Sequence, residues 1–459
     1  MTPSGPLDDV TGEPGSGLRP LARLRWVLQA RSGASATALT LASSVAILGL
    51  NLGTGVISAR LLGPGGRGEL AAIVMWPQFL AFMLTLGLPS SLLYNLRCYE
   101  DKGRQLFSVA LLAGTIMGGV AIAVGVLLIP YRLVSYSPEL VRFAQLAMVT
   151  APVALMFVVL NSALLARHEF FLYNFTRVLS PLIALIAMLG LIAAGGLSPH
   201  TAAIATLAAA VPIVGWMVLR FWWLYPPTTK GLRWASQRLI SYGLRGYGAD
   251  LLGTLTEQID KVVVVGLLDP AMMGIYVVAV SFAQMLNVFP TAVVPVLFPK
   301  SSGRSTDEVV AVTGRAARLN GISSVLAGAV VALLAPWIVG RVFGADYLGA
   351  VPVLRILLLE GVLRGTIWIL VQAFMALDKP GLVSALQGAG LCVTVPLLLA
   401  LVPRYGLLGA GSALLLATTT RLVLVLACFP LILRTSPPSL RPRWGEVDLL
   451  IRQAQSMDR

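Results

Sequence analysis

Charged side chains are scarce in this sequence of 459 residues. Only 12% of the residues are charged, against about 25% in typical soluble domains, whereas 57% are hydrophobic and the mean hydropathy is +0.84. A soluble protein this apolar could not cover its own surface with polar groups. The composition therefore excludes a soluble globular protein and predicts an integral membrane protein.

Residues that bind metals or form disulfides are also few. Cys98, Cys392 and Cys428 lie far apart, in or beside apolar stretches, so neither a disulfide framework nor a metal-binding spacing follows. His168 and His200 are too far apart to form a two-histidine helix motif. The P-loop motif is absent, which excludes ATP binding of that kind. We expect no metal and no cofactor, so transport would draw on an ion gradient, the substrate gradient or a partner.

Basic residues outnumber acidic ones by 34 to 20, which gives a formal net charge of +14. They form short clusters between apolar runs and no continuous basic face, which excludes a nucleic-acid partner. If the first apolar segment starts in the cytoplasm, 21 basic residues fall on the cytoplasmic side and six on the other. Because cytoplasmic loops are enriched in basic residues, we expect a bacterial plasma-membrane protein with both termini in the cytoplasm.

Apolar stretches of about 20 residues are long enough to cross a bilayer as helices. The connections between them are short, and none is long enough to form a soluble domain. The sequence therefore predicts an all-α, polytopic membrane protein with twelve transmembrane helices. The expected helices are 36–60, 69–96, 105–130, 140–165, 170–194, 199–224, 237–268, 271–299, 314–340, 347–377, 380–402 and 407–433.

The helices divide into two halves. Residues 225–236, YPPTTKGLRWAS, are expected to form a cytoplasmic linker between a six-helix bundle over 36–224 and a second bundle over 237–433. Residues 434–459 form a cytoplasmic tail. Residues 1–35 form another, which is either disordered or contains a short helix lying on the membrane surface.

An internal repeat supports this division. LLGPGGRGELAAIV, which begins at Leu61, aligns with LLDPAMMGIYVVAV at an offset of 206 residues. Pro64 and Gly68 then match Pro270 and Gly274. Six helices return the chain to its starting side, so the two bundles should be related by a pseudo-twofold axis along the membrane normal. Transporters with such parallel repeats hold their substrate between the halves.

Gly63, Gly65 and Gly68 also satisfy the pattern G-x-G-x-x-G. That pattern binds dinucleotides only between a strand and a helix. Here it connects two expected membrane helices, and a proline lies among the glycines. We interpret it as a tight turn.

The seventh expected helix contains a stripe of polar and charged residues. Asp250, Thr254, Glu257 and Lys261 follow the spacing i, i+4, i+7, i+11 and share one face. Charges within a bilayer are costly and usually face a water-filled cavity or another polar helix. The short side chains of Asp250 and Glu257 cannot easily reach the headgroups. The alternative is a structural pair between Glu257 and Lys261 at i, i+4, which leaves Asp250 unexplained.

Two later helices also carry charges. Glu360 and Arg364 are spaced i, i+4 and can pair. Arg421 stands alone near the middle of the last helix and needs an acidic partner or an anion. Arg177 and Arg220 lie near the cytoplasmic interface, where long side chains reach the headgroups. The expected helices contain seven basic residues and four acidic ones, and this excess of basic residues favours an anionic substrate.

Three segments carry a family resemblance: VISARLLGPGGRGELAAIVMWPQFLAFMLTLGLPSSLLYNL, TEQIDKVVVVGLLDPAMMGIYVVAVSF and ALDKPGLVS. They resemble bacterial polysaccharide and O-antigen flippases of the multidrug/oligosaccharidyl-lipid/polysaccharide exporter superfamily, over roughly residues 35–435. The resemblance implies two bundles around a V-shaped central cavity. It also implies that the protein flips an undecaprenyl-pyrophosphate-linked oligosaccharide for surface polysaccharide export. Gln258, Asp260 and Lys261 match family positions that usually read QIDR or QIDK.

The expected site combines two groups of residues. Basic residues would attract the anionic headgroup during alternating access, and acidic residues would bind a proton or a sodium ion or compete with the substrate for the basic groups. Membrane lipids and polysaccharide-assembly proteins are further expected partners. The basic residues are Arg245, Arg364 and Arg421, and the acidic residues are Asp250, Glu257, Asp260 and Glu360.

Two other functions fit the sequence less well. A multidrug exporter of the same superfamily would need an aromatic, anionic cavity for cationic drugs, and the basic excess disfavours it. A membrane polymerase or ligase acting on lipid-linked sugars would need acid and base side chains near water, often on a large outer loop. The outer loops here are short and poor in His, Asp and Glu. We therefore expect a transporter and no enzymatic activity.

Overall fold

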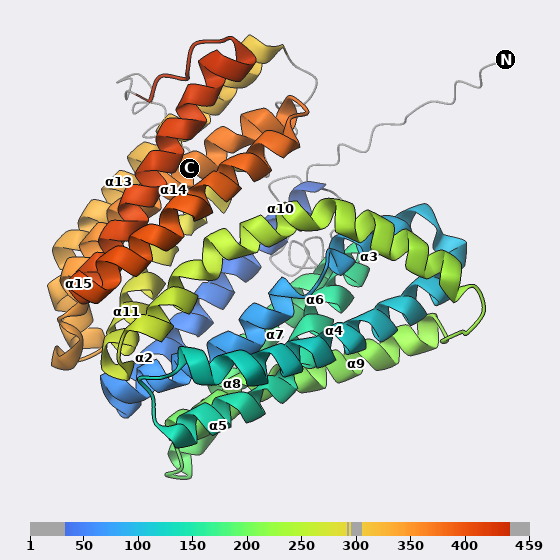
Figure 1. Cartoon of the computed structure of the whole chain (residues 1–459), viewed down its shortest axis with the longest axis horizontal. Coiled ribbons are helices and arrows are strands. Elements are labelled where there is room, and N and C mark those ends of the chain that lie inside the picture. Colours follow the sequence, from blue (N-terminus) through green and yellow to red (C-terminus); the bar gives the residue numbers. More distant parts are fainter. Residues whose placement is uncertain (1–32, 292, 295–304, 441–459) are drawn as a thin grey trace, which may run out of the picture.

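The structure is a computed structural model that describes residues 33–291, 293–294 and 305–440 (Figure 1). Every regular element among these residues is a helix, and eight of the described helices are apolar and long enough to cross a membrane. The prediction of an all-helical polytopic membrane protein is confirmed. Most of the two expected tails lies outside the described residues, and the side of the membrane that the termini occupy stays a prediction.

The described helices follow one another with short connections. Five short 3-10 or π segments (η1 to η5) lie between or at the ends of the longer helices. The α-helices are α2 (Gly33–Met83), α3 (Leu88–Cys98), α4 (Gly103–Arg132), α5 (Pro138–Ala147), α6 (Ala151–Ala166), α7 (Phe170–Ala193), α8 (Pro199–Ala208), α9 (Ala210–Leu224), α10 (Leu232–Leu267), α11 (Pro270–Ala283), α13 (Thr306–Val342), α14 (Ala350–Ala376) and α15 (Pro380–Cys428).

Twelve membrane crossings are recognisable in the described part of the chain once two long helices are divided. α2 bends at Gly63, where φ is 68°, and α15 bends at Gly406, where φ is 55°. Only glycine adopts this left-handed backbone at little cost. The tight turn expected in GPGGRG is therefore present at Gly63. α5 with α6 and α8 with α9 each make one crossing.

α10 and α14 are not among the eight most apolar helices, although they contain 36 and 27 residues. They are the helices in which the sequence predicted clusters of charge. α10 also links the two groups of helices, because it contacts α3 and α4 on one side and α15 on the other (Figure 1). α10 therefore lies between the two groups, whereas α14 packs against α11, α13 and α15 of the second group.

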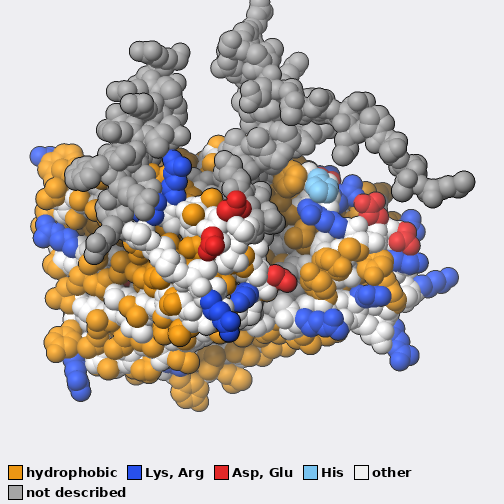
Figure 2. Space-filling view, turned by 90° about the horizontal axis from the view of Figure 1, so that it is seen from above, with side chains coloured by type: hydrophobic (Ala, Val, Ile, Leu, Met, Phe, Trp, Pro, Cys, Tyr) orange, Lys and Arg blue, Asp and Glu red, His pale blue; other side chains and the backbone are white. Residues whose placement is uncertain are grey.

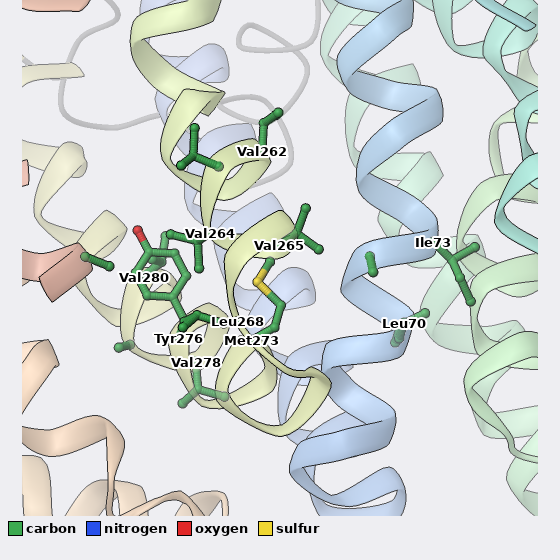
Figure 3. Close-up of a cluster of buried hydrophobic side chains, with 14 of the residues drawn as sticks. Leu70, Ile73, Val262, Val264, Val265, Leu268, Met273, Tyr276, Val278 and Val280 are labelled. Atoms are coloured by element: carbon green, nitrogen blue, oxygen red, sulfur yellow. The ribbon is translucent and has the colours of Figure 1, made fainter. Parts of the chain in front are cut away.

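Apolar packing holds α2, α10 and α11 together where the two groups meet. Val264, Val265 and Tyr276 are fully buried there, and Leu70 and Ile73 of α2 belong to the same cluster (Figure 3). Lipid is as apolar as these side chains, so close van der Waals packing stabilises such an interface inside a membrane. Many large apolar side chains are exposed on the outside of the molecule, and Figure 2 shows apolar side chains over much of one face, as expected where a surface meets lipid.

A reciprocal contact between α2 and α11 closes one end of this interface. A Cβ at Gly68 would lie 1.7 Å from the carbonyl oxygen of Pro270, and a Cβ at Gly274 would lie 2.0 Å from that of Pro64. These four residues are the ones that the sequence repeat matches. A relation between two complete six-helix bundles stays a prediction, as does a V-shaped cavity.

Replacing Gly68 or Gly274 by alanine is expected to force α2 and α11 apart, because a backbone carbonyl cannot rotate away as a side chain can. Overpacking of this kind costs about 1–3 kcal/mol, so each variant should have a lower melting temperature when purified. Gly119→Ala in α4 is the matched control, since nothing lies within 4 Å of a Cβ there. Unchanged melting temperatures for both test variants would contradict the contact.

Candidate functional site

Three adjoining cavities form a row, or file, between the two groups of helices. The closed-end cavity, next to the contact between α2 and α11, has a volume of about 360 Å³, the middle cavity about 360 Å³ and the far cavity about 450 Å³. Gln258 and Gln284 line both the closed-end and the middle cavity, and Thr291 and Trp368 line both the middle and the far cavity. Each cavity therefore adjoins the next.

The closed-end cavity is lined by amides, hydroxyls and two basic groups. Its basic residues are Arg67 from α2 and Lys261 from α10. Their described neighbours in the lining include no carboxylate. The uncharged polar residues are Asn51, Thr54, Gln78, Thr206, Gln258, Ser281 and Gln284.

Arg67 lies in the connection between the first two expected helices, 36–60 and 69–96, and the sequence analysis did not include it in the site. The helix resumes directly after Gly63, so Arg67 lies in the first turns of a helix and its side chain enters the protein. Its Nε is buried without a hydrogen-bond partner. The sequence signal that could have placed Arg67 in a helix was Pro64, because proline is favoured at the first position of a helix.

The charged stripe of α10 faces the cavities over part of its length. Glu257 lines the middle cavity, and Lys261 lines the closed-end cavity. Lys261 Nζ donates a hydrogen bond to Gln258 Oε1 at 3.1 Å, so it bonds to this neighbour rather than forming the i, i+4 pair with Glu257. Asp250 is exposed, and its carboxylate accepts a hydrogen bond from Ser90 Oγ at 2.9 Å.

The middle cavity gathers the charges of α10, α14 and α15. Glu257, Arg364 and Arg421 line it together. Arg364 forms an ion pair with Glu360 at 3.5 Å, which confirms the predicted pairing, and the buried Glu360 accepts a second bond from Thr418 Oγ1 at 2.9 Å. Arg421 forms no ion pair with a described residue, and the Nε atoms of Arg364 and Arg421 are both buried without a hydrogen-bond partner. This cavity therefore contains one basic group that an ion pair holds in place and one that no ion pair to the described residues holds.

Four of the expected site residues, Arg245, Asp250, Asp260 and Glu360, lie outside the three cavity linings. Arg245 is exposed, and Asp250 bonds to α3 as described above. Asp260 is buried, and its carboxylate accepts a hydrogen bond from the hydroxyl of Tyr276 at 2.9 Å. Their predicted roles in binding or coupling stay predictions.

The far cavity is the most apolar of the three. Arg177 is its only basic residue in the described lining, and its guanidinium lies 5.2 Å from the ring centroid of Tyr173. Phe170, Leu41 and Trp368 supply apolar surface beside it. Arg177 therefore faces a cavity, whereas the sequence predicted that it would extend to the headgroups.

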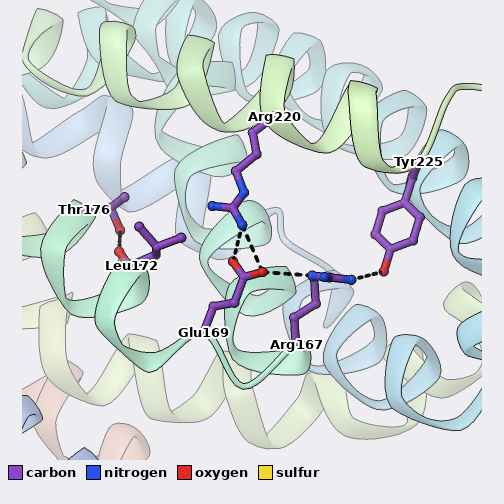
Figure 4. Close-up of polar contacts among 6 residues, drawn as sticks. All are labelled: Arg167, Glu169, Leu172, Thr176, Arg220 and Tyr225. Carbon is purple, nitrogen blue, oxygen red and sulfur yellow. Dashed lines mark hydrogen bonds and ion pairs between the residues drawn. The ribbon is translucent and has the colours of Figure 1, made fainter. Parts of the chain in front are cut away.

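A separate ion-pair cluster ties the ends of α6, α7 and α9 together (Figure 4). Glu169 pairs with Arg167 and with Arg220, each at 3.0 Å. Arg167 also donates a hydrogen bond to the hydroxyl of Tyr225 at 2.9 Å. Arg220 was expected to extend to the headgroups, and it instead pairs with an acidic residue. Because these residues line none of the three cavities, we interpret the cluster as structural.

The three linings together contain five basic residues and one carboxylate, that of Glu257. Such a lining is suited to an anionic ligand, because buried basic groups require counter-charges. No group of three or more His, Cys, Asp or Glu residues that could hold a metal ion occurs in the described residues. The basic residues are Arg67, Arg177, Lys261, Arg364 and Arg421.

Residues 34–303 match the family described as polysaccharide biosynthesis proteins. A curated relative, the probable flippase AglR of Haloferax volcanii, is 27% identical over 219 residues. The matched region covers 45% of this chain and 44% of that relative, so the chain spans less than half of its length.

Solved structures share the fold. The lipid II flippase MurJ, in an inward closed conformation, superposes with a TM-score of 0.74 at 15% identity, over 87% of this chain and 88% of that one. A multidrug resistance MATE transporter of the MOP superfamily, in an inward-facing conformation, gives 0.68 at 16% identity, over 87% and 99% of the two chains. A MOP superfamily transporter from Pyrococcus furiosus gives 0.59 at 16% identity, over 85% and 92%.

The two kinds of comparison agree with each other and with the helical architecture. The family match covers more than half of the chain, and the structural matches extend over the second group of helices as well. At such low identity the solved structures show the fold alone. The resemblance found in the sequence is confirmed: the chain belongs to the family of polysaccharide biosynthesis proteins and has the fold of MOP superfamily transporters.

Proposed function

We propose that this protein flips a lipid-linked oligosaccharide, carried on undecaprenyl pyrophosphate, across the plasma membrane for surface polysaccharide export. The observation that carries the proposal is the file of three cavities between the two groups of helices, with five basic residues and one carboxylate in its lining. A pyrophosphate is a compact anion that cannot cross hydrocarbon unaided, and a basic path through the protein replaces its hydration.

The middle cavity is the proposed pyrophosphate site. Arginine presents several N–H donors in a plane and binds phosphate oxygens in pairs. Arg364 is already engaged in an ion pair with Glu360, whereas Arg421 forms no ion pair within the described part of the chain and has a buried Nε without a hydrogen-bond partner, as Arg364 also has. Arg421 is therefore the proposed principal anchor, with Arg364 beside it. Arg245 is exposed and would attract the headgroup before it enters.

Glu257 provides a means of release. It lines the same cavity as Arg364 and Arg421, so its carboxylate competes with the pyrophosphate for these basic groups. A proton or a sodium ion that neutralises Glu257 would favour substrate binding. Loss of that ion would favour release, which couples transport to an ion gradient. Asp250, Asp260 and Glu360 are retained as secondary candidates for this role.

Alternating access requires the contact at the closed end to separate. The carbonyls of Pro64 and Pro270 meet Gly274 and Gly68 there, and the hydroxyl of Tyr347 also donates to the carbonyl of Ala59 at 3.1 Å. When these contacts open, the closed-end cavity gains access to the opposite side of the membrane. Movement of the two groups about the file of cavities then exposes the substrate to one side at a time.

A multidrug exporter is the second candidate, because the fold is shared with a multidrug resistance MATE transporter. A cationic drug would need carboxylates in the cavity, and Glu257 is the single carboxylate in the described linings. Drug susceptibility of a deletion strain separates the two functions. Under our proposal the strain loses surface polysaccharide and keeps its drug tolerance.

Replacing Arg421 by glutamine should reduce flipping strongly, because the main anchor of the pyrophosphate is lost. A charged hydrogen bond contributes about 1.5–3 kcal/mol, which corresponds to a reduction of about 10- to 100-fold. The measurement is the initial rate of flipping of a polyprenyl-diphosphate oligosaccharide in proteoliposomes. Arg142→Gln, at an exposed position of α5, removes the same charge and should leave the rate unchanged. A normal rate for Arg421→Gln, or normal surface polysaccharide at normal protein level for Arg421→Ala, would refute the proposed anchor.

Replacing Glu257 by glutamine should remove the response to an ion gradient while leaving substrate binding intact, because the amide cannot bind or release a proton and attracts sodium weakly. The experiment imposes a proton gradient, and separately a sodium gradient, across proteoliposomes and records the flipping rate. The wild-type rate should rise with one of the gradients, and the variant rate should stay flat. A variant that still responds in full would exclude Glu257 as the coupling residue.

A further inference from the structure

The middle and closed-end cavities differ in their balance of charge. In the middle cavity, Arg364 and Arg421 are offset by Glu257 in the lining and by Glu360 behind it. In the closed-end cavity, the two basic residues have no acidic residue among the described lining. The uncompensated positive charge of the proposed transport path therefore lies beyond the pyrophosphate site, at the closed end.

Neighbouring residues do not neutralise these two basic groups. Lys261 donates to the uncharged Gln258, and Arg67 makes no hydrogen bond or ion pair to any described residue. Asp260 follows Gln258 closely in the sequence, but it bonds to Tyr276 and lies outside the lining. Arg67 is half-buried and its Nε is buried without a partner, so an anion bound beside it would offset the cost of burying its charge.

The rest of the closed-end lining suits a carbohydrate. Its seven uncharged polar side chains supply both donors and acceptors, which match the hydroxyl groups of a sugar. Phe79 and Phe82 add apolar surface. The volume of about 360 Å³ falls within the range of about 300–1,000 Å³ typical of small-ligand pockets.

We propose that the closed-end cavity binds the glycan and that this glycan is acidic, with Arg67 and Lys261 binding the carboxylate of a uronic acid. The inference rests on the proposed function, in which the pyrophosphate occupies the middle cavity. In the described linings the two cavities have only Gln258 and Gln284 in common, so the two pairs of basic residues lie on either side of these amides. In this arrangement a sugar joined to the pyrophosphate extends past the two glutamine amides into the closed-end cavity, and its carboxylate reaches Arg67 and Lys261.

The test compares two synthetic lipids that differ in one group. Both are polyprenyl-diphosphate disaccharides, and the terminal sugar is glucuronic acid in one and glucose in the other. Their affinities are measured for the full chain in nanodiscs of phosphatidylcholine, which carries no net charge and does not compete. Because a charged hydrogen bond is gained, the glucuronic acid probe should bind about 10- to 100-fold more tightly than the glucose probe.

Variants then locate the preference. Arg67→Gln and Lys261→Gln should each weaken binding of the acidic probe by a larger factor than binding of the neutral probe, and so reduce the preference. Arg67→Lys retains the charge and should retain part of the preference, which also reports that the site folds. Arg142→Gln, exposed on α5, is the matched control and should retain all of it. Arg421→Gln should weaken the binding of both probes.

Three results would overturn the inference. Equal affinities of the wild type for the two probes would show that the glycan site does not select a carboxylate, and the proposed function would stand. Equal weakening of both probes by Arg67→Gln would place the pyrophosphate, rather than the sugar, at Arg67. Failure of both probes to bind the wild type would refute the proposed function, and this inference with it.

Discussion

A charge inside a bilayer must find a partner or face water, and this constraint organises the molecule. Glu360 pairs with Arg364, and Asp260 accepts from Tyr276, so these acidic groups are satisfied within the helical packing. Basic groups that form no ion pair with the described residues, above all Arg67 and Arg421, line the cavities between the two groups of helices. The distribution of charge in the sequence therefore determines which helix faces meet at the centre and which face lipid.

The sequence was sufficient to predict features that depend on spacing along the chain. Twelve crossings, the turn at Gly63 and the ion pair between Glu360 and Arg364 all follow from local pattern. It was not sufficient for contacts that depend on how helices rotate against one another. Lys261 bonds to Gln258 rather than to Glu257, because a helical stripe fixes which residues share a face and leaves their partners to packing. Asp250 lies on the same stripe and contacts α3 instead of a cavity.

The cavities change in character along the file. The far cavity is mostly apolar, the middle cavity contains opposed charges, and the closed-end cavity is lined by amides, hydroxyls and two basic groups. A lipid-linked oligosaccharide has the same order of chemistry, from hydrocarbon through pyrophosphate to sugar. Each part of such a molecule would therefore meet a lining of matching polarity. The polarities match in only one orientation of the lipid-linked oligosaccharide, the one that places its glycan in the closed-end cavity.

The reciprocal contact of Gly68 and Gly274 is made between backbone atoms. Side chains elsewhere on α2 and α11 take no part in it, so selection for a different cargo can alter the cavity lining without weakening the closure. The same independence lets the two halves diverge in charge, as they have here, while still meeting in matched geometry. Related proteins should therefore tolerate substitutions in the cavity linings but not at the two glycines. If one glycine were replaced by a larger residue, the opposite glycine could not become smaller to make room.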